Sequence, residues 1–445
     1  MFHNQTIKEK LLRGGGWAFS GKFITALVAL GSNALLARLL SPEELGAYFL
    51  TVSLVSVATI TAQLGLTQTI IKLVAESMGA ARPARARLAV RWAVRLTSVG
   101  ALTVACGLAF GGGSWVANHI FHSKIMSPIM GLAAVWVIII SFQQLIAEIF
   151  RGFHDIRLAT CFGGLVTGLL AMLMFLGLWL WQQDGGELYQ VIIITLVAGF
   201  SSLALSSIIL WNKLINLPAS KGDAITGSEI IKISWPLWVT GLFLLVLGQV
   251  DLWIMGVFRS AEEVAIYGAV FRIVALITIP LMIVNAVAPP VIAEMYAAGE
   301  TKKMESILRT VATYASIPSL IVLGAFALYG KSILGVFFGE YYRSGATILI
   351  ILSVGQLVNV WAGSCGMVLI FTRYQSTMML ITALSGVCTA YLAWFLVEKY
   401  AGVGVAVSAS LGMILQNLMM LIAAKRKVGV WTHMKMPAIK NIRLR

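Results

Sequence analysis

Long runs of apolar residues, twelve in all, take up most of this sequence. Each run is about 20 residues or longer, enough for an α-helix to cross the hydrocarbon core of a bilayer. The runs lie near residues 17–40, 45–72, 88–110, 127–150, 158–181, 189–212, 232–257, 263–290, 308–330, 344–371, 375–397 and 402–424. The sequence therefore predicts an all-α integral membrane protein of about twelve transmembrane helices.

Charged residues are too scarce to form a soluble surface. They make up 11% of the 445 residues, whereas roughly a quarter of an ordinary soluble domain is charged. The four cysteines lie within apolar runs and have no metal-ligand spacing, so we interpret them as small apolar residues. Neither a disulfide framework nor a metal site is expected, and no cofactor is predicted.

Basic residues outnumber acidic ones by 33 to 18 and lie in short clusters between the apolar runs. In a membrane protein, such clusters mark the cytoplasmic side and face anionic lipid, so membrane lipid is the expected partner and nucleic acid is not. With both termini placed inside, 24 Lys and Arg residues fall on the cytoplasmic side, 6 on the outer side and 3 within the runs. The first run is too long for the apolar core of a signal peptide, so it is predicted to remain as a helix.

One short motif occurs twice. Ser41–Tyr48 and Ser260–Tyr267 share a Ser-x-Glu-Glu-x-x-x-Tyr pattern at an offset of 219 residues, and each copy lies in the turn between the first two runs of its half. An even number of spans per half makes this a parallel repeat, with two lobes related by an axis along the membrane normal. The predicted domains are an N-terminal six-helix lobe (1–213), a cytoplasmic linker (214–231), a C-terminal six-helix lobe (232–424) and a basic cytoplasmic tail (425–445).

Both copies lie in stretches that look familiar. Asn33–Tyr48 and Gln63–Ala75 resemble the opening of bacterial polysaccharide flippases of the lipid-linked oligosaccharide, Wzx type, in the multidrug/oligosaccharidyl-lipid/polysaccharide exporter superfamily. Asp251–Arg272 is similar to the seventh and eighth helices of that family. One departure is Ala265, where the first copy of the motif has Gly46.

The resemblance implies a V-shaped fold with a central cavity between two lobes. It also implies a flippase that moves undecaprenyl-pyrophosphate-linked oligosaccharide from the cytoplasmic to the periplasmic leaflet of the bacterial inner membrane, for surface polysaccharide biosynthesis. The cavity would have cationic and polar walls for the glycan and pyrophosphate. Expected partners are the lipid-linked oligosaccharide, H⁺ or Na⁺ as a coupling ion, and a glycan polymerase.

Two charged residues lie deep within predicted helices. Counted from the 258–262 turn at about 1.5 Å per residue, Asp251 is about 12 Å and Arg272 about 18 Å inside the bilayer. A charge at such depth requires a partner or a wet cavity. Two interpretations stay open: a neutral pair that joins two helices, or an Arg272 that meets substrate phosphate, which suits its planar fork, while Asp251 orients it or exchanges protons.

Lys22 lies only about 7 Å along the first helix from Trp17. Its ammonium group would reach the inner interface by snorkelling, or it would contact the substrate headgroup at the inner mouth. Seven uncharged polar residues also lie within spans, and either helix–helix hydrogen bonds or a sugar-lined cavity would explain them. They are Asn33, Gln63, Gln143, Gln249, Asn285, Gln356 and Asn359, and the predicted cavity site takes Asn33, Gln63, Gln249, Asn285 and Asn359 from them.

Prolines lie at the ends of runs in the first half, but Pro236, Pro280 and Pro318 lie inside runs in the second half. Proline inside a helix removes a hydrogen bond and commonly bends it. We therefore expect bends at Pro236, Pro280 or Pro318 and straighter helices in the first half.

Several functional classes are excluded or disfavoured. The chain has no phosphate-binding G-x-x-x-x-G-K-[ST] motif, nucleophile elbow or metal-ligand set, so an enzyme or a direct ATP drive is not expected. A membrane-embedded glycan polymerase or ligase would need a large outer catalytic loop, and the longest outer connection is only about residues 111–126. The alternative that remains is a cation-coupled drug antiporter of the same superfamily, which would need acidic residues deep in the first lobe.

Overall fold

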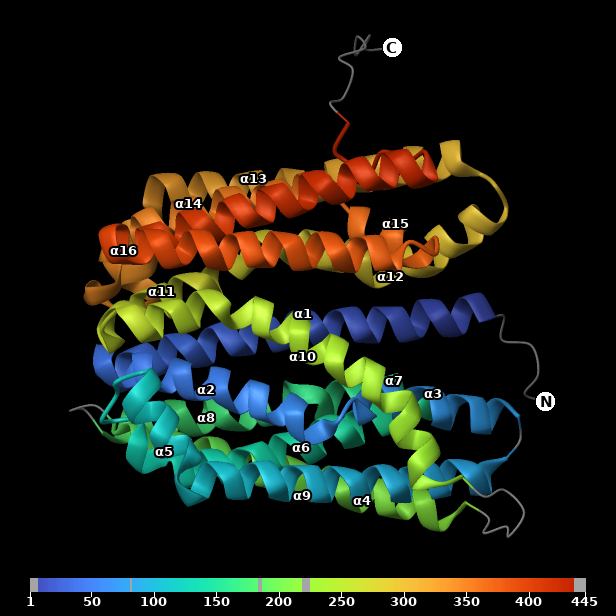
Figure 1. The fold of residues 1–445 in the computed structure, drawn as a ribbon, viewed down its shortest axis with the longest axis horizontal. Coiled ribbons are helices and arrows are strands. Elements are labelled where there is room, and N and C mark those ends of the chain that lie inside the picture. Colours follow the sequence, from blue (N-terminus) through green and yellow to red (C-terminus); the bar gives the residue numbers. More distant parts are fainter. Residues whose placement is uncertain (1–6, 81, 183–185, 218–224, 436–445) are drawn as a thin grey trace. The chain divides into compact units, whose positions relative to one another are not determined.

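The structure is a computed structural model that describes residues 7–80, 82–182, 186–217 and 225–435. These residues form α-helices with short π and 3₁₀ segments (η), and no strand occurs among them (Figure 1). The elements are α1 (Ile7–Leu39), α2 (Pro42–Gln63), α3 (Leu66–Gly79), α4 (Pro83–Gly107), η1 (Leu108–Gly112), α5 (Gly113–Trp115), η2 (Val116–Ile120), η3 (Ser127–Ile129), α6 (Met130–Gly152), α7 (Ile156–Thr160), η4 (Cys161–Leu165), α8 (Val166–Trp181), α9 (Leu188–Ile215), α10 (Gly227–Phe258), α11 (Ala261–Val274), η5 (Ala275–Thr278), α12 (Ile279–Ala297), α13 (Thr301–Phe338), η6 (Glu340–Gly345), α14 (Ala346–Ala362), α15 (Cys365–Phe371) and α16 (Gln375–Val428).

Nine helical stretches of the described chain are long and apolar enough to cross a membrane. The last, α16, has 54 residues and a non-helical Ala401 (φ 49°) inside it, so it comprises two spans. The apolar part of α1, Phe23–Leu39, and the 32-residue α10 supply the remaining two. The predicted all-α membrane fold with about twelve spans is therefore confirmed.

The chain divides into two compact units, Met1–Ala265 and Ile266–Arg445. In the first unit, α6 is central and packs against α2, α3, α4 and α9. The next helix, α10, also packs here, against α2, α3 and α4. The domain limits expected from the apolar runs and the V-shaped arrangement stay predictions; residues 218–224 of the expected linker and 436–445 of the expected tail lie outside the described residues.

The first copy of the repeated motif forms a capping box. The Ser41 side chain accepts from the Glu44 backbone N–H, and Glu44 Oε2 accepts from the Ser41 N–H at 3.0 Å. Glu44 Oε1 also accepts from the N–H of Leu188 at 3.1 Å, so one carboxylate caps both α2 and α9. A Cβ at Gly46 would lie 2.6 Å from the carbonyl carbon of Ala261 and closer still to its oxygen. Glycine therefore stands here because the backbone after α10 touches α2.

The predicted helix at 45–72 is wrong in one respect, since it breaks into α2 and α3. Leu64 (φ 50°) and Gly65 (φ 74°) both adopt left-handed conformations at the break. A Cβ at Gly65 would lie 2.7 Å from the backbone nitrogen of Trp238, so α10 approaches this break closely. The tertiary contact, rather than the apolar pattern, sets the position of the break.

In the second unit, α14 packs against α13 and α16, and α15 packs against α16; Figure 1 shows α13, α14 and α16 running side by side. The predicted helix at 344–371 is also interrupted, because Gly363 adopts φ 71° and ψ −151° between α14 and α15. A Cβ there would lie 2.6 Å from the carbonyl oxygen of Thr432. The break is thus fitted to a later segment of the chain.

The proline expectation is wrong for the first half. Interruptions there occur without proline, at Leu64–Gly65, at Phe110–Gly111 and at Gly164 (φ 135°). In the second half, the α-helix tightens into the 3₁₀ segment η5 directly before Pro280, as expected for a residue without an N–H donor. Glycine and residues in left-handed conformations therefore interrupt the helices of the first half, where the prolines lie only at the ends of the apolar runs.

Residues Val430–Lys435, which we call the C-terminal strap, follow α16 and fold back on the second unit. The Trp431 N–H donates to Glu305 Oε2 at 3.1 Å, the Thr432 hydroxyl donates to the Ala362 carbonyl at 2.6 Å, and the Met434 N–H donates to the Trp361 carbonyl at 2.9 Å. Val430 and Thr432 are fully buried. The strap therefore holds the start of α13 to the end of α14.

Candidate functional site

The first unit contains a cavity of about 340 Å³ between α1, α2, α6, α8 and α9. Its polar lining consists of amides and hydroxyls, and its apolar lining includes four aromatic rings. The side chains that define its chemistry are Ser32, Asn33, Tyr48, Trp136, Gln143, Gln144, Phe162, Thr167, Phe175 and Thr195. Gly163 and Gly164, at the π segment between α7 and α8, also line it, so part of the pocket wall is an irregular helix.

Gln143 joins three helices beside this pocket. Its Nε2 donates to the hydroxyl of Thr167 on α8 and to the carbonyl of Gly199 on α9, both at 2.9 Å. A Cβ at residue 199 would lie 2.9 Å from Ile139 Cγ2, so a glycine is needed for α9 to come this close to α6. The side chain of Gln143 is therefore part of the pocket wall and a link between its helices.

Gln63 supports the same wall from α2. It is 3% exposed, and its Nε2 donates to Gln144 Oε1 at 2.8 Å. Gln144 itself is exposed and lines the pocket. Of the predicted site residues, Asn33 lies in the pocket lining and donates through Nδ2 to the Ala29 carbonyl at 2.6 Å. Gln63 does not line the pocket itself but contacts the lining residue Gln144.

We expect Gln143→Leu to lower the stability of the protein. Leucine keeps the approximate volume but leaves the Thr167 hydroxyl and the Gly199 carbonyl without this donor, a loss of about 1 kcal/mol for interhelical hydrogen bonds in membranes. The thermal denaturation midpoint of the purified protein in detergent measures it. Gln68→Leu, at an exposed position on α3, is the matched control, and equal midpoints for the two variants would contradict the linking role.

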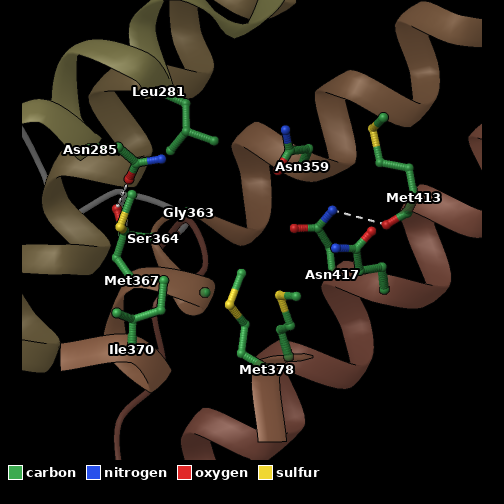
Figure 2. A pocket seen from close by; sticks show the side chains of 13 residues that line it. Leu281, Asn285, Asn359, Gly363, Ser364, Met367, Ile370, Met378, Met413 and Asn417 are labelled. Carbon is green, nitrogen blue, oxygen red and sulfur yellow. Dashed lines mark hydrogen bonds between the residues drawn. The ribbon is translucent and has the colours of Figure 1, made fainter. Parts of the chain in front are cut away.

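The second unit contains a cavity of about 280 Å³ at the break between α14 and α15 (Figure 2). Asn285 and Ser364 lie on one side of it, Asn359 and Asn417 on the other, and methionines form much of its base. Its lining comprises Leu281, Asn285, Asn359, Gly363, Ser364, Gly366, Met367, Ile370, Met378, Met413, Gln416, Asn417 and Met420. Discontinuous helices line substrate and ion sites in many transporters, which makes this a second candidate site.

Hydrogen bonds fix most of these polar groups. The Ser364 hydroxyl donates to Asn285 Oδ1 at 2.7 Å, which ties the helix break to α12. Asn417 Nδ2 donates to the Met413 carbonyl at 2.9 Å, and Asn359 Nδ2 donates to Gln356 Oε1 at 3.3 Å. Predicted residues Asn285 and Asn359 thus lie together in this pocket, on α12 and α14.

The other predicted residues lie elsewhere. Gln249 on α10 accepts from the Ser53 hydroxyl on α2 at 2.8 Å, and the Trp253 indole donates to the same hydroxyl at 2.7 Å, so Gln249 makes a helix–helix contact in the first unit. Arg272 is half-buried in the last turn of α11, where its Nη1 donates to the Gly268 carbonyl at 3.0 Å.

Asp251 is half-buried on α10 in the first unit, whereas Arg272 belongs to the second. The predicted pairing of these two residues stays a prediction. The side chain of Lys22 lies outside the described residues, so its predicted role also stays untested.

The predicted site took its amides from polar residues within spans, and it did not include Gln144, Thr167, Gln416 or Asn417. For three of them, the feature of the sequence that could have indicated a role is a pair of adjacent amides. Gln143–Gln144 and Gln416–Asn417 are adjacent pairs of amides on single helices, so one member can bond a neighbouring helix while the other faces a cavity.

Comparison with known proteins identifies a family and a relative of this chain. Residues 11–296 match the family described as "Polysaccharide biosynthesis protein". The chain is 25% identical over 446 residues to a Shigella flexneri protein described as "Putative O-antigen transporter", covering 95% of this chain and 100% of that one.

The fold is similar to those of two solved transporters. One is an inward-facing multidrug resistance MATE family transporter of the MOP superfamily, at a TM-score of 0.78 and 15% identity, covering 91% of this chain and 94% of that one. The other is the lipid II flippase MurJ in an inward closed conformation, at a TM-score of 0.65 and 15% identity, covering 92% and 87%. At such identities the likeness establishes a shared fold alone.

The resemblance noted at Asn33–Tyr48, Gln63–Ala75 and Asp251–Arg272 is thus confirmed by a match that covers more than half of the chain. Its helices are those of a multi-pass membrane protein with the fold of superfamily transporters. Because that match covers residues 11–296, this chain belongs to the family described as "Polysaccharide biosynthesis protein".

Proposed function

We propose that this protein translocates an undecaprenyl-pyrophosphate-linked oligosaccharide across the inner membrane for surface polysaccharide biosynthesis. The observation that carries the proposal is the family match over residues 11–296, together with a full-length relative described as an O-antigen transporter. Two pockets lined by amides and hydroxyls add support, because polyhydroxylated substrates need such groups.

The proposed direction is from the cytoplasmic to the periplasmic leaflet, with both termini in the cytoplasm. The distribution of Lys and Arg supports this orientation, since 24 of the 33 fall on one side. A reporter enzyme that is active only in the cytoplasm, fused after the C-terminal residue, should be active in cells.

Arg272 is proposed to meet the pyrophosphate, with Asp251 as its partner when the substrate is absent. A guanidinium donates two parallel hydrogen bonds to phosphate, and the oxygens of a carboxylate partner can accept the same two bonds in the resting state. Lys22 is proposed to contact the headgroup at the inner mouth. An H⁺ or Na⁺ gradient is the proposed drive, and a glycan polymerase the proposed recipient of the product.

Transport of a fluorescent lipid-linked oligosaccharide in proteoliposomes tests the proposal. The purified chain should make the glycan in the opposite leaflet accessible to an added glycosidase, and empty liposomes should not. Replacing the glycan lipid with a fluorescent phosphatidylcholine distinguishes specific flipping from general lipid scrambling. Absence of glycan transfer under both H⁺ and Na⁺ gradients would refute the proposed function.

A cation-coupled drug antiporter is the second candidate, because the fold is also that of MATE family transporters. Such a transporter would bind a cation through buried carboxylates. Among the described residues that line the two pockets, none is acidic. Proton-dependent efflux of ethidium from the same proteoliposomes, without transfer of the lipid-linked glycan, would favour this candidate.

A further inference from the structure

We infer that the pocket of the first unit binds one uncharged sugar residue of the glycan, with an acetamido sugar as the best match. The inference rests on the proposed function and specifies the class of substrate at this pocket. It is carried by three properties of the lining: the lack of ionisable side chains, the hydrogen-bonding groups that remain available, and an aromatic wall.

The charge of the lining is the first property. None of the described residues around this pocket is Asp, Glu, Lys, Arg or His. Moving a carboxylate, phosphate or organic cation out of water without a counter-charge is costly. An uncharged polar group carries no such cost when it is hydrogen-bonded. The pocket therefore selects against uronic acids, phosphates and cationic drugs.

The available hydrogen-bonding groups are the second property. Gln144 uses Oε1 as the acceptor for Gln63, which leaves both protons of its Nε2 for a ligand. Gln143 uses Nε2 for Thr167 and Gly199, and Asn33 uses Nδ2 for Ala29, so the amide oxygen of each is the part left over. Within the described part of the chain, no other residue bonds these leftover groups.

The three residues that carry these two remaining amide oxygens and one amide NH₂ thus line a single cavity. An acetamido group has one N–H donor and one C=O acceptor, so Gln143 or Asn33 can accept from its N–H while Gln144 donates to its oxygen. Sugar hydroxyls both donate and accept, and can use the remaining positions. The lining is therefore complementary to a neutral acetamido sugar rather than to an anion, which would need donors alone.

The aromatic wall is the third property. Tyr48 on α2 and Trp136 on α6 both line the pocket, with ring centroids 6.1 Å apart and planes inclined by 33°. Aromatic faces are electron-rich and favour the slightly positive C–H bonds that one face of a sugar ring presents. The volume of about 340 Å³ is at the small end of the range for ligand pockets, roughly 300–1,000 Å³, which suits a single sugar residue.

The pocket of the second unit lacks this combination. Its described lining has amides but no aromatic residue, and its apolar part is methionine-rich. The inference is accordingly confined to the first unit.

Ligand-observed NMR titration of the purified full-length protein in detergent tests the preference. The probes are N,N′-diacetylchitobiose, a disaccharide of similar size that contains glucuronic acid, and tetraphenylphosphonium. We expect the diacetyl disaccharide to bind at least about ten-fold more tightly than the acidic disaccharide, in keeping with the cost of an unpaired buried charge. Equal or tighter binding of the acidic disaccharide or of the cation would overturn the inference.

Gln144→Glu tests the location. A carboxylate keeps an acceptor for Gln63 but removes the NH₂ donors, so the affinity for N,N′-diacetylchitobiose should fall by about ten-fold or more. Gln68→Glu places the same change on an exposed part of α3 and should leave the affinity unchanged. An equal affinity for the two variants would place the sugar elsewhere.

The failure of this inference is distinguishable from the failure of the proposed function. If the unsubstituted protein flips the lipid-linked glycan but prefers the acidic probe, the function stands and the pocket assignment is wrong. If it binds the diacetyl disaccharide but flips no lipid-linked glycan, the proposed transport is wrong and the sugar site stands.

Discussion

Replacing Arg272 with alanine should reduce glycan transfer by about a hundred-fold or more, while the protein still inserts into the membrane. A guanidinium–phosphate contact is charge-assisted and bidentate, and its loss within a membrane leaves the substrate phosphate without a counter-charge. Nη1 is engaged with the Gly268 carbonyl, yet a guanidinium has five N–H donors in total. Arg272→Lys should keep part of the activity, because it retains the charge but loses the planar fork.

Glycan transfer per inserted protein in proteoliposomes is the measurement. Arg343→Ala is the control, since Arg343 lies on η6 with its Nη2 2.7 Å from Glu340 Oε1 and both side chains are exposed, and a surface ion pair contributes little. Normal transfer by Arg272→Ala would support the other interpretation, in which Arg272 and Asp251 only join helices. In that case Asp251→Asn and Arg272→Ala should both lower the denaturation midpoint without changing transfer.

Gly46→Ala should destabilise the first unit more than any conservative change at its surface. The added Cβ would lie 2.6 Å from the carbonyl carbon of Ala261, and closer to the oxygen. This backbone cannot yield as a flexible side chain would, so α2 and the start of α11 must separate. Overpacking of this kind costs about 1–3 kcal/mol or more. The thermal denaturation midpoint in detergent and the yield of folded protein should both fall.

Gly131→Ala on α6 is the matched control for this prediction. A Cβ at Gly131 meets nothing within 4 Å, and alanine is the better helix former by about 1 kcal/mol. The control should therefore match or exceed the unsubstituted protein in stability. An unchanged denaturation midpoint for Gly46→Ala would mean that the backbone of Ala261 does not lie in close contact with Gly46 of α2.

The number of membrane spans and their helical type could be predicted because each span depends on its own apolar composition, which must match the lipid along its whole length. The turn at Ser41–Tyr48 could be predicted for a similar reason, and the capping box found there joins two residues, Ser41 and Glu44, that are three positions apart. The breaks at Gly65 and Gly363 could not be predicted, because each is fitted to a distant backbone, that of Trp238 or Thr432.

The candidate site divides in the same way. Asn33, Asn285 and Asn359 were predicted as polar residues within spans, and all three line pockets. The rotation of each helix decides what an amide contacts: Gln143 joins α6 to α8 and α9, whereas the next residue, Gln144, bonds Gln63 on α2 and keeps its NH₂. Nothing in the apolar pattern fixes that rotation, so Gln249, which contacts Ser53, was assigned to the cavity with the same reasoning.

The C-terminal strap has a consequence for how the protein is made. Its partners on α13, Glu305 and Arg309, are 126 and 124 residues earlier in the chain, and its partner Ala362 at the end of α14 is 70 residues earlier. Helices are delivered to the membrane in order, so α13 and α14 are inserted well before the ribosome reaches residue 430. Until then the ends of these helices lack their contacts with the strap, and the backbone at the Gly363 break is not covered by Thr432. Assembly of the second unit is therefore completed from the C-terminal side, after the last span has entered the bilayer.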